Sequence, residues 1–119
     1  MTSGGRTIAV TRGDVVLVPF PFAELTASKA RPALVLSGER FNRSEGKVIV
    51  AAITSNLRAH RGATNLPLGR WRESGLLKPS VVTSWLATLS PELILMRIGT
   101  LPRLDLQAVE SRVRSALEL

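Results

Sequence analysis

The side chains that this chain offers for chemistry are arginines, lysines and hydroxyls. It has no cysteine and a single histidine, His60. These counts exclude thiolate nucleophiles, sulfur-ligated metals, a His-rich zinc site and a two-histidine acid/base pair within one chain. The nine acidic residues are scattered singly, so a two-metal nuclease site is not indicated. No nucleophile elbow, Walker loop or dinucleotide fingerprint occurs.

Guanidinium and hydroxyl donors suit reactions in which a phosphate gains negative charge. RNA carries its own nucleophile, the 2′-OH, so a protein that cleaves RNA need not supply one. An arginine stays charged at working pH and binds two phosphate oxygens with its planar fork. We therefore expect any such reaction to need neither a metal nor another cofactor.

The net charge favours a polyanionic partner. Sixteen Lys and Arg against nine Asp and Glu give +7. Between Glu45 and Glu73 the chain has five basic residues and no acidic one. Nucleic acid, an acidic protein segment and an anionic membrane surface all fit this balance, and a merely solvated basic face is the plainer alternative.

The pattern of apolar residues predicts short strands separated by turns, with one helix at the end. The helix is expected from about residue 104 to 117, because its apolar side chains recur at 3.6-residue spacing. We expect a mobile loop over 21–30, a hairpin-type connection over 38–46 and a short helical turn at 90–92. The predicted strands are 15–20, 33–37, 47–54, 64–68, 80–83 and 95–101.

These elements predict a mainly β protein, a small and strongly bent barrel closed by a C-terminal helix. Residues 1–11 are expected to form a flexible lead-in, and residues 12–119 a single domain. No apolar run approaches the ~20 residues of a membrane span, and residues 1–6 are not followed by the apolar core of an export signal. We expect a cytoplasmic protein that does not interact with membranes.

Several segments, in order and spacing, resemble the MazF/PemK toxin family. They are RGDVVLVPFPF at 12–22, RPALVLS at 31–37, VAAITS at 50–55, LKPSVV at 77–82, IGTL at 98–101 and the final helix. Each piece alone is weak, but the combination is specific and covers the chain from about residue 12 to its end.

The resemblance implies an SH3-like β-barrel, a fold shared with the CcdB gyrase poisons, and a homodimer. It implies a ribosome-independent, sequence-specific endoribonuclease acting on single-stranded RNA. Cleavage would be metal-free, with 2′-OH attack giving a 2′,3′-cyclic phosphate and a 5′-OH. A cognate antitoxin with an acidic toxin-binding segment would neutralise the protein, and we expect that segment to occupy the RNA groove.

The family's catalytic arginine falls on Arg31 and its strand-end threonine on Thr54. In this interpretation Arg31 stabilises the phosphorane and supplies a proton to the leaving 5′-oxygen, while Thr54 holds the scissile phosphate. Many relatives carry Glu or Gln a few residues before the arginine, where this chain has TASK at 26–29. Glu24 is therefore the candidate general base, at a shifted position.

The loop over 21–30 would cover the RNA and help to set sequence choice. Trp71, between two arginines, could stack a base, whereas Trp85 is expected in the core or a dimer interface. Asp14 is expected in a turn, where its acid could orient an arginine. The candidate RNA-binding residues are basic, hydroxyl, amide or aromatic: Lys29, Ser28, Ser55, Asn56, Arg58, His60, Arg61, Arg70, Trp71, Arg72 and Lys78.

Two other functions remain open at the level of sequence. The altered residues before Arg31 leave room for a catalytically weak or inactive homologue that only binds RNA or antitoxin. A gyrase-targeting toxin on the same fold is the other alternative. Gyrase poisons end in Trp-Gly-Ile, whereas this chain ends RSALEL, which argues against it.

Overall fold

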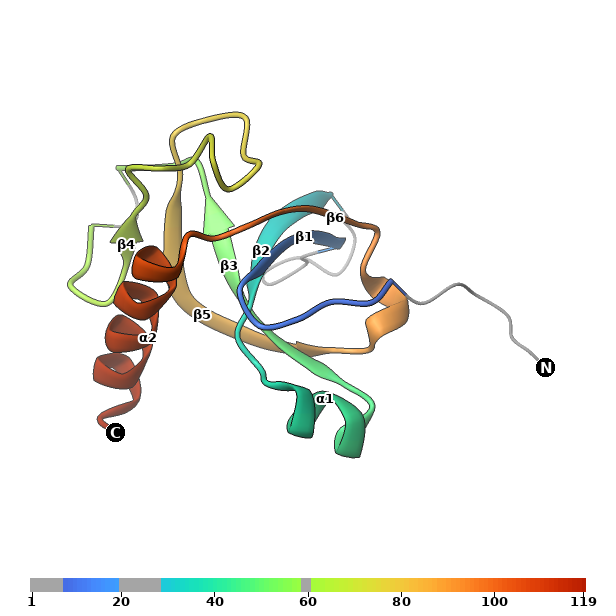
Figure 1. The fold of residues 1–119 in the computed structure, drawn as a ribbon. Helices are drawn as coiled ribbons and strands as arrows, with labels where there is room; N and C mark the ends of the chain where they lie inside the picture. The colour runs from blue at the N-terminus through green and yellow to red at the C-terminus, as the bar shows by residue number, and fades with distance from the viewer. Residues whose placement is uncertain (1–7, 20–28, 59–60) are drawn as a thin grey trace.

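A six-stranded antiparallel sheet forms the body of the protein. The computed structural model describes residues 8–19, 29–58 and 61–119. The sheet has the order β4-β5-β3-β2-β1-β6 and curls into a half-barrel (Figure 1). The predicted mainly β barrel with a closing helix is confirmed. The strands are β1 (Asp14–Pro19), β2 (Ala30–Val35), β3 (Val48–Thr54), β4 (Leu66–Pro67), β5 (Val81–Leu89) and β6 (Met96–Thr100).

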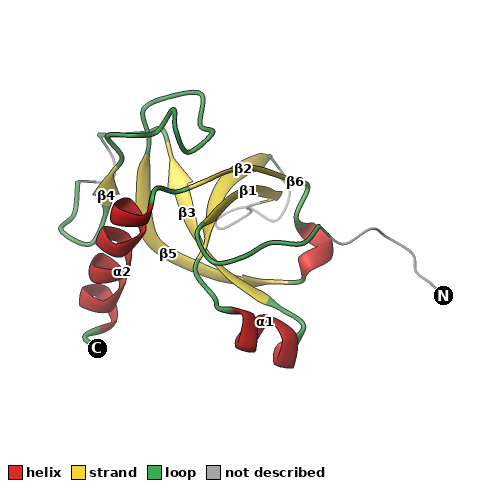
Figure 2. Ribbon diagram, in the orientation of Figure 1, coloured by secondary structure: helices red, strands yellow, loops and turns green. Residues whose placement is uncertain are grey.

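Three helical segments among the described residues accompany the sheet and are coloured red in Figure 2. Helix α1 (Glu39–Glu45) joins β2 to β3, the 3₁₀ turn η1 (Pro91–Leu93) joins β5 to β6, and α2 (Arg103–Leu117) packs beside β4 and β5. The last helix and the short turn confirm the sequence prediction. No helix among the described residues is long and apolar enough to cross a membrane.

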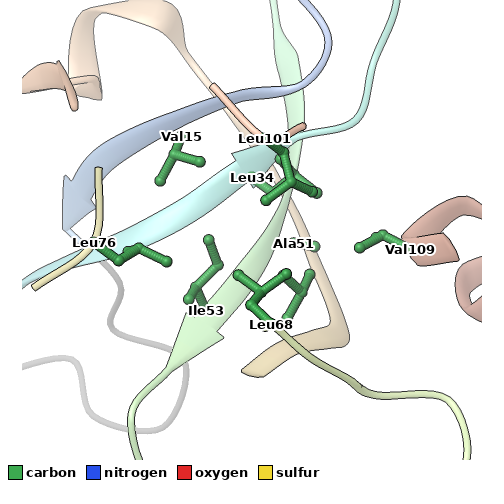
Figure 3. Packing of buried hydrophobic residues seen from close by; sticks show 9 residues of the cluster. Val15, Leu34, Ala51, Ile53, Leu68, Leu76, Leu101 and Val109 are labelled. Atoms are coloured by element: carbon green, nitrogen blue, oxygen red, sulfur yellow. The ribbon is translucent and has the colours of Figure 1, made fainter. Parts of the chain in front are cut away.

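Both faces of the sheet are buried at its centre, which explains the unbroken apolar run of β3. Alternate residues of β1, β2 and β3 enter two separate core clusters. In the first cluster, Val109 of α2 and Leu68 and Leu76 of the β4–β5 connection cover Ala51 and Ile53 (Figure 3). Each such side chain contributes about 1.5–3 kcal/mol when fully buried, so the helix and this connection are both fixed to the sheet.

The connection between β2 and β3 contains a helix that was not predicted. Residues 38–46 do join two antiparallel neighbours, as a hairpin-type link should, but 39–45 form α1 within it. The helix buries no side chain, so its sequence lacks apolar periodicity. Local interactions stabilise it instead: Arg43 pairs with Glu39 at 3.0 Å, and Gly46 ends it in the left-handed conformation that glycine adopts readily.

Strand β5 is longer than predicted because a bulge interrupts its apolar pattern. Ala51 pairs with Leu86 and Ile53 with Val82, so three residues of β5 lie opposite Ala52. The Thr83 hydroxyl donates to the Ala52 carbonyl at 2.8 Å and satisfies it. Trp85 lies in the bulge with 55% of its surface exposed, so it is not a core residue of the single chain, and its predicted alternative place in a dimer interface stays a prediction.

Two glycines let the chain before β5 touch β6. A Cβ on Gly75 would lie 2.0 Å from the Ile98 carbonyl oxygen, and one on Gly99 would lie 2.2 Å from that of Ser74. Gly75 also has φ +88°, a conformation that side chains with a Cβ rarely adopt. These contacts hold the start of the 75–80 segment against β6.

A nearly buried carboxylate ties β1 to β6. Asp14 accepts the Thr11 N–H at 2.8 Å, the Thr100 hydroxyl at 3.1 Å and Arg97 Nε at 3.2 Å. Asp14 is 4% exposed, and all of these donors compensate its loss of water. The expected turn carboxylate therefore does orient an arginine, Arg97 on β6.

Candidate functional site

A groove of about 560 Å³ opens where β2 begins and β3 ends. Strands β1, β2, β3 and β6 contribute to its lining, together with the 75–80 segment that the glycine contacts hold against β6. The described lining residues are Leu17, Lys29, Ala30, Arg31, Pro32, Ile53, Thr54, Ser55, Gly75, Leu76, Leu77, Lys78, Ser80, Met96 and Ile98.

The sheet brings Arg31 and Thr54 to the same groove. The antiparallel β2–β3 ladder ends where Ala33 pairs with Ala52, and Arg31 and Thr54 each lie two residues beyond that pair, on strand ends that line the groove. Pro32 favours extended backbone at Arg31 and so aligns the arginine with the strand. An anion in the groove therefore has both side chains in its lining.

The Thr54 hydroxyl is oriented by the chain that follows it. It accepts the backbone N–H of Asn56 at 3.0 Å. A hydroxyl has one hydrogen to donate and two lone pairs that accept. Because one lone pair is engaged by Asn56, the hydroxyl hydrogen is left to donate to an acceptor in the groove.

Three cations line the groove, and the described lining contains no acidic residue. The side-chain cations of Lys29, Arg31 and Lys78 make no ion pair or hydrogen bond with another described residue. Some arginines elsewhere are engaged: Arg97 pairs with Asp14 at 3.2 Å, and Arg12 pairs with Glu110. The groove thus offers positive charge with unused donors, as a phosphate-binding site requires.

Most of the remaining lining is apolar, which sequence reasoning missed. Leu17, Leu76, Leu77, Met96 and Ile98 come from three separate segments. In the sequence such residues look like ordinary strand or core positions, and only the curl of the sheet brings them to one groove. Leu77 is nonetheless 92% exposed and Met96 49%.

The structure therefore brings together five of the predicted site residues: Lys29, Arg31, Thr54, Ser55 and Lys78. Asn56 and Arg58 follow on the exposed turn after β3. Neither they nor Arg61 belong to the described lining, although the Asn56 backbone orients Thr54. Glu24, Ser28 and His60 lie outside the described residues.

The predicted residues at 70–72 lie apart from the described groove lining. Trp71 packs, partly buried, against the first core cluster, and Arg72 stacks over its ring at 4.4 Å. Arg70 lies 4.0 Å from Asp105 at the start of α2. These contacts fix the 69–75 turn against the helix.

The chemistry of the groove is that of an anion site rather than a metal centre. Its polar donors are ammonium, guanidinium and hydroxyl groups, whereas cations prefer carboxylate, imidazole or thiolate ligands. Among the described residues, no group of three His, Cys, Asp or Glu side chains gathers anywhere.

Comparison with solved structures shows the same fold in other proteins. A mycobacterial endoribonuclease in complex with its cognate antitoxin is 22% identical, with a TM-score of 0.73 and coverage of 93% of this chain and 97% of that one. The Mycobacterium tuberculosis toxin MazF-mt6 is 26% identical, with a TM-score of 0.72 and coverage of 89% and 97%. The MazE–MazF structure from Deinococcus radiodurans is 21% identical, with a TM-score of 0.69 and coverage of 94% and 98%.

Comparison with curated proteins by sequence found no match. The family model described as "PemK-like, MazF-like toxin of type II toxin-antitoxin system" matches residues 11–117. That match spans nearly the whole sheet and α2, including both sides of the groove. The chain belongs to the PemK/MazF family of toxins from type II toxin–antitoxin systems.

Proposed function

We propose that this protein is the toxin of a toxin–antitoxin module and a sequence-specific, metal-independent endoribonuclease that cleaves single-stranded RNA. The observation that carries the proposal is the presence of Arg31 and Thr54 in one groove, whose described lining has three cations without a described side-chain partner and no acid. Relatives of the same fold carry the name endoribonuclease.

The reaction proposed is attack by the 2′-oxygen of one nucleotide on the adjacent phosphorus. The phosphorus–O5′ bond breaks, which leaves a 2′,3′-cyclic phosphate and a 5′-OH. Arg31 donates to the non-bridging oxygens as their charge grows, and the Thr54 hydroxyl donates to one of them. Preorganised donors of this kind lower the barrier because they need no reorientation during the reaction.

Two proton transfers complete the reaction. The 2′-OH proton goes to a general base, for which Glu24 stays a prediction from the sequence. The leaving 5′-oxygen takes up a proton, and the sequence assignment gives this transfer to Arg31. The metal-free character of the proposal rests on this chain's own donors, which suffice for the phosphate's charge.

The apolar part of the lining favours single-stranded over duplex RNA. In an A-form duplex the bases are stacked and their edges are hard to reach, whereas unpaired bases can turn out and contact apolar side chains. Leu77 and Met96 offer such contacts next to the cations. Ser55, at the polar end, can bond a base edge or a phosphate.

The proposal includes a homodimer and an acidic antitoxin. Related toxins of this fold are described in complex with a cognate antitoxin or as a MazE–MazF pair. The unpaired cations attract an acidic peptide by the same field that attracts RNA. The antitoxin should therefore compete with RNA, and undiminished RNA affinity of the antitoxin-bound toxin would contradict this part.

The test is cleavage of a long single-stranded RNA in EDTA, with the ends mapped. We compare the wild type with Arg31→Ala and with Arg40→Ala, which removes an exposed arginine from α1, outside the described lining. Discrete cuts by wild type and Arg40→Ala, but not by Arg31→Ala, are expected. Full activity of Arg31→Ala would refute its role.

Absence of cutting by folded wild type, across several unrelated RNAs, would refute the nuclease. RNA or antitoxin binding without cutting would then favour the inactive homologue. Inhibition of gyrase without RNA cutting would favour the gyrase-targeting alternative.

A further inference from the structure

Leu77 is the most exposed large apolar side chain described in the structure, with 92% of its surface accessible. Its position is nonetheless fixed on both sides. Gly75 abuts the backbone of β6, and the Ser80 hydroxyl donates to the Lys78 carbonyl at 2.8 Å. A leucine held in water by a constrained backbone gains nothing for the fold, so its contact surface is available to a ligand.

Leu77 and Met96 lie in the part of the groove formed by the 75–80 segment and β6, away from Arg31 on β2, with Lys78 directly after Leu77. Leu17 of β1 pairs with Met96 of β6, and the Gly75 contact brings the 75–78 segment against the same strand. On the adjacent strand, Arg31 pairs with Val18. Met96 is therefore two strands from Arg31, or about 10 Å at the backbone.

We propose that Leu77, together with Met96, seats a nucleobase of the nucleotide next to the phosphate at Arg31, and that Leu77 determines which base is accepted. The inference rests on the proposed function. A nucleotide joins an anionic phosphate to a flat, weakly polar ring. The groove holds Arg31 for the phosphate and, about one nucleotide away, Leu77 and Met96 for the ring. Beside these apolar side chains lie cations without a described partner, and they favour a nucleotide over a peptide side chain.

The chemistry of the Leu77 and Met96 side chains indicates how they select a base. Leucine and methionine side chains carry no strong hydrogen-bond donor or acceptor. They contact the face of a ring, as stacking platforms for single strands do, and the methionine thioether adapts to its shape. Selection at this position should follow the size and stacking of the base rather than its edge.

The experiment uses a pool of single-stranded RNAs with randomised sequence, cut by wild type, Leu77→Ala and Leu77→Phe. The matched control is Leu104→Ala on α2, where the leucine is 66% exposed and outside the described lining. Sequencing the products gives the preference at each position around the cut. Sequencing the RNA retained on the protein gives the same preference without requiring cleavage.

Leu77→Ala should flatten the base preference at one position and lower kcat/KM on the preferred sequence by roughly threefold to tenfold. Leu77→Phe should restore the rate and shift the preference toward the larger bases. Leu104→Ala should match the wild type. Melting temperatures should stay unchanged, because the side chain is in solvent.

An unchanged preference in Leu77→Ala would overturn the inference, as would an equal loss on all sequences. If Leu77→Ala lost antitoxin affinity but kept its RNA selection, the inference would be overturned, and Leu77 would instead bind a peptide. These failures differ from failure of the proposed function, in which the wild type cuts no RNA at all.

Discussion

Replacing Thr54 with valine removes one hydroxyl and keeps the β-branched shape that suits the end of β3. The hydroxyl accepts the Asn56 N–H at 3.0 Å, so its hydrogen is directed to another acceptor. If that acceptor is the scissile phosphate, the contact strengthens as the phosphorane gains charge. Loss of one such donor costs about 10²–10³ in rate, or about 2.7–4 kcal/mol in the barrier.

The cost to the fold should be much smaller. Thr54→Val removes the hydroxyl that accepts the backbone N–H of Asn56. Asn56 is exposed, so water can accept this N–H instead. A hydrogen bond of this kind contributes about 0.5–1.5 kcal/mol to the free energy of unfolding. Activity and stability are therefore expected to separate by a wide margin.

The assay is single-turnover cleavage of a short RNA that contains one mapped site, with urea unfolding run in parallel. Thr54→Ser keeps the hydroxyl and serves as the matched control, which should stay within a few-fold of wild type. The reasoning is refuted if Thr54→Val cleaves as fast as Thr54→Ser. A large loss in unfolding free energy would instead show that the threonine is structural.

Three further predictions concern the groove and its support. Lys78→Ala should make the slope of log K against log salt concentration shallower by about 0.7, where K is the association constant for single-stranded RNA. An equal change in Arg40→Ala would contradict a specific phosphate contact. Asp14→Ala should lower the free energy of unfolding by about 3 kcal/mol in urea, because its charge-assisted bonds join β1 to β6, and a loss below about 1 kcal/mol would show that water replaces them. Gly99→Ala places a Cβ 2.2 Å from the Ser74 carbonyl, so melting temperature and RNA affinity should both fall; unchanged values would mean that the 75–80 segment moves freely.

The parts that the sequence predicts well are those set by neighbouring residues. The β-branched run of β3 and the 3.6-residue period of α2 each carry a local pattern. Arg31 was identified by the Arg-Pro pair and the family resemblance, and the structure places it at the start of β2, in the same groove as Thr54. Lys29, Ser55 and Lys78 line that groove as well.

The parts that the sequence misses depend on contacts between distant segments. Helix α1 buries no side chain, so its sequence has no apolar period that would predict a helix. The bulge in β5 is visible only against Ala52 of β3, and it turns Trp85 toward solvent. The apolar side chains around Leu77 gather only because Gly75 contacts β6 where the sheet curls.

The most direct test of the account is the chemistry of the cut itself. A short RNA with one mapped site is prepared in two forms, with and without the 2′-OH of the nucleotide on the 5′ side of the scissile phosphate. We expect rapid cleavage of the first form in EDTA, ending in a 2′,3′-cyclic phosphate, and no cleavage of the second. Cleavage of the deoxy-substituted form at the same bond would contradict attack by the substrate's own hydroxyl, and with it the roles given to Arg31 and Thr54.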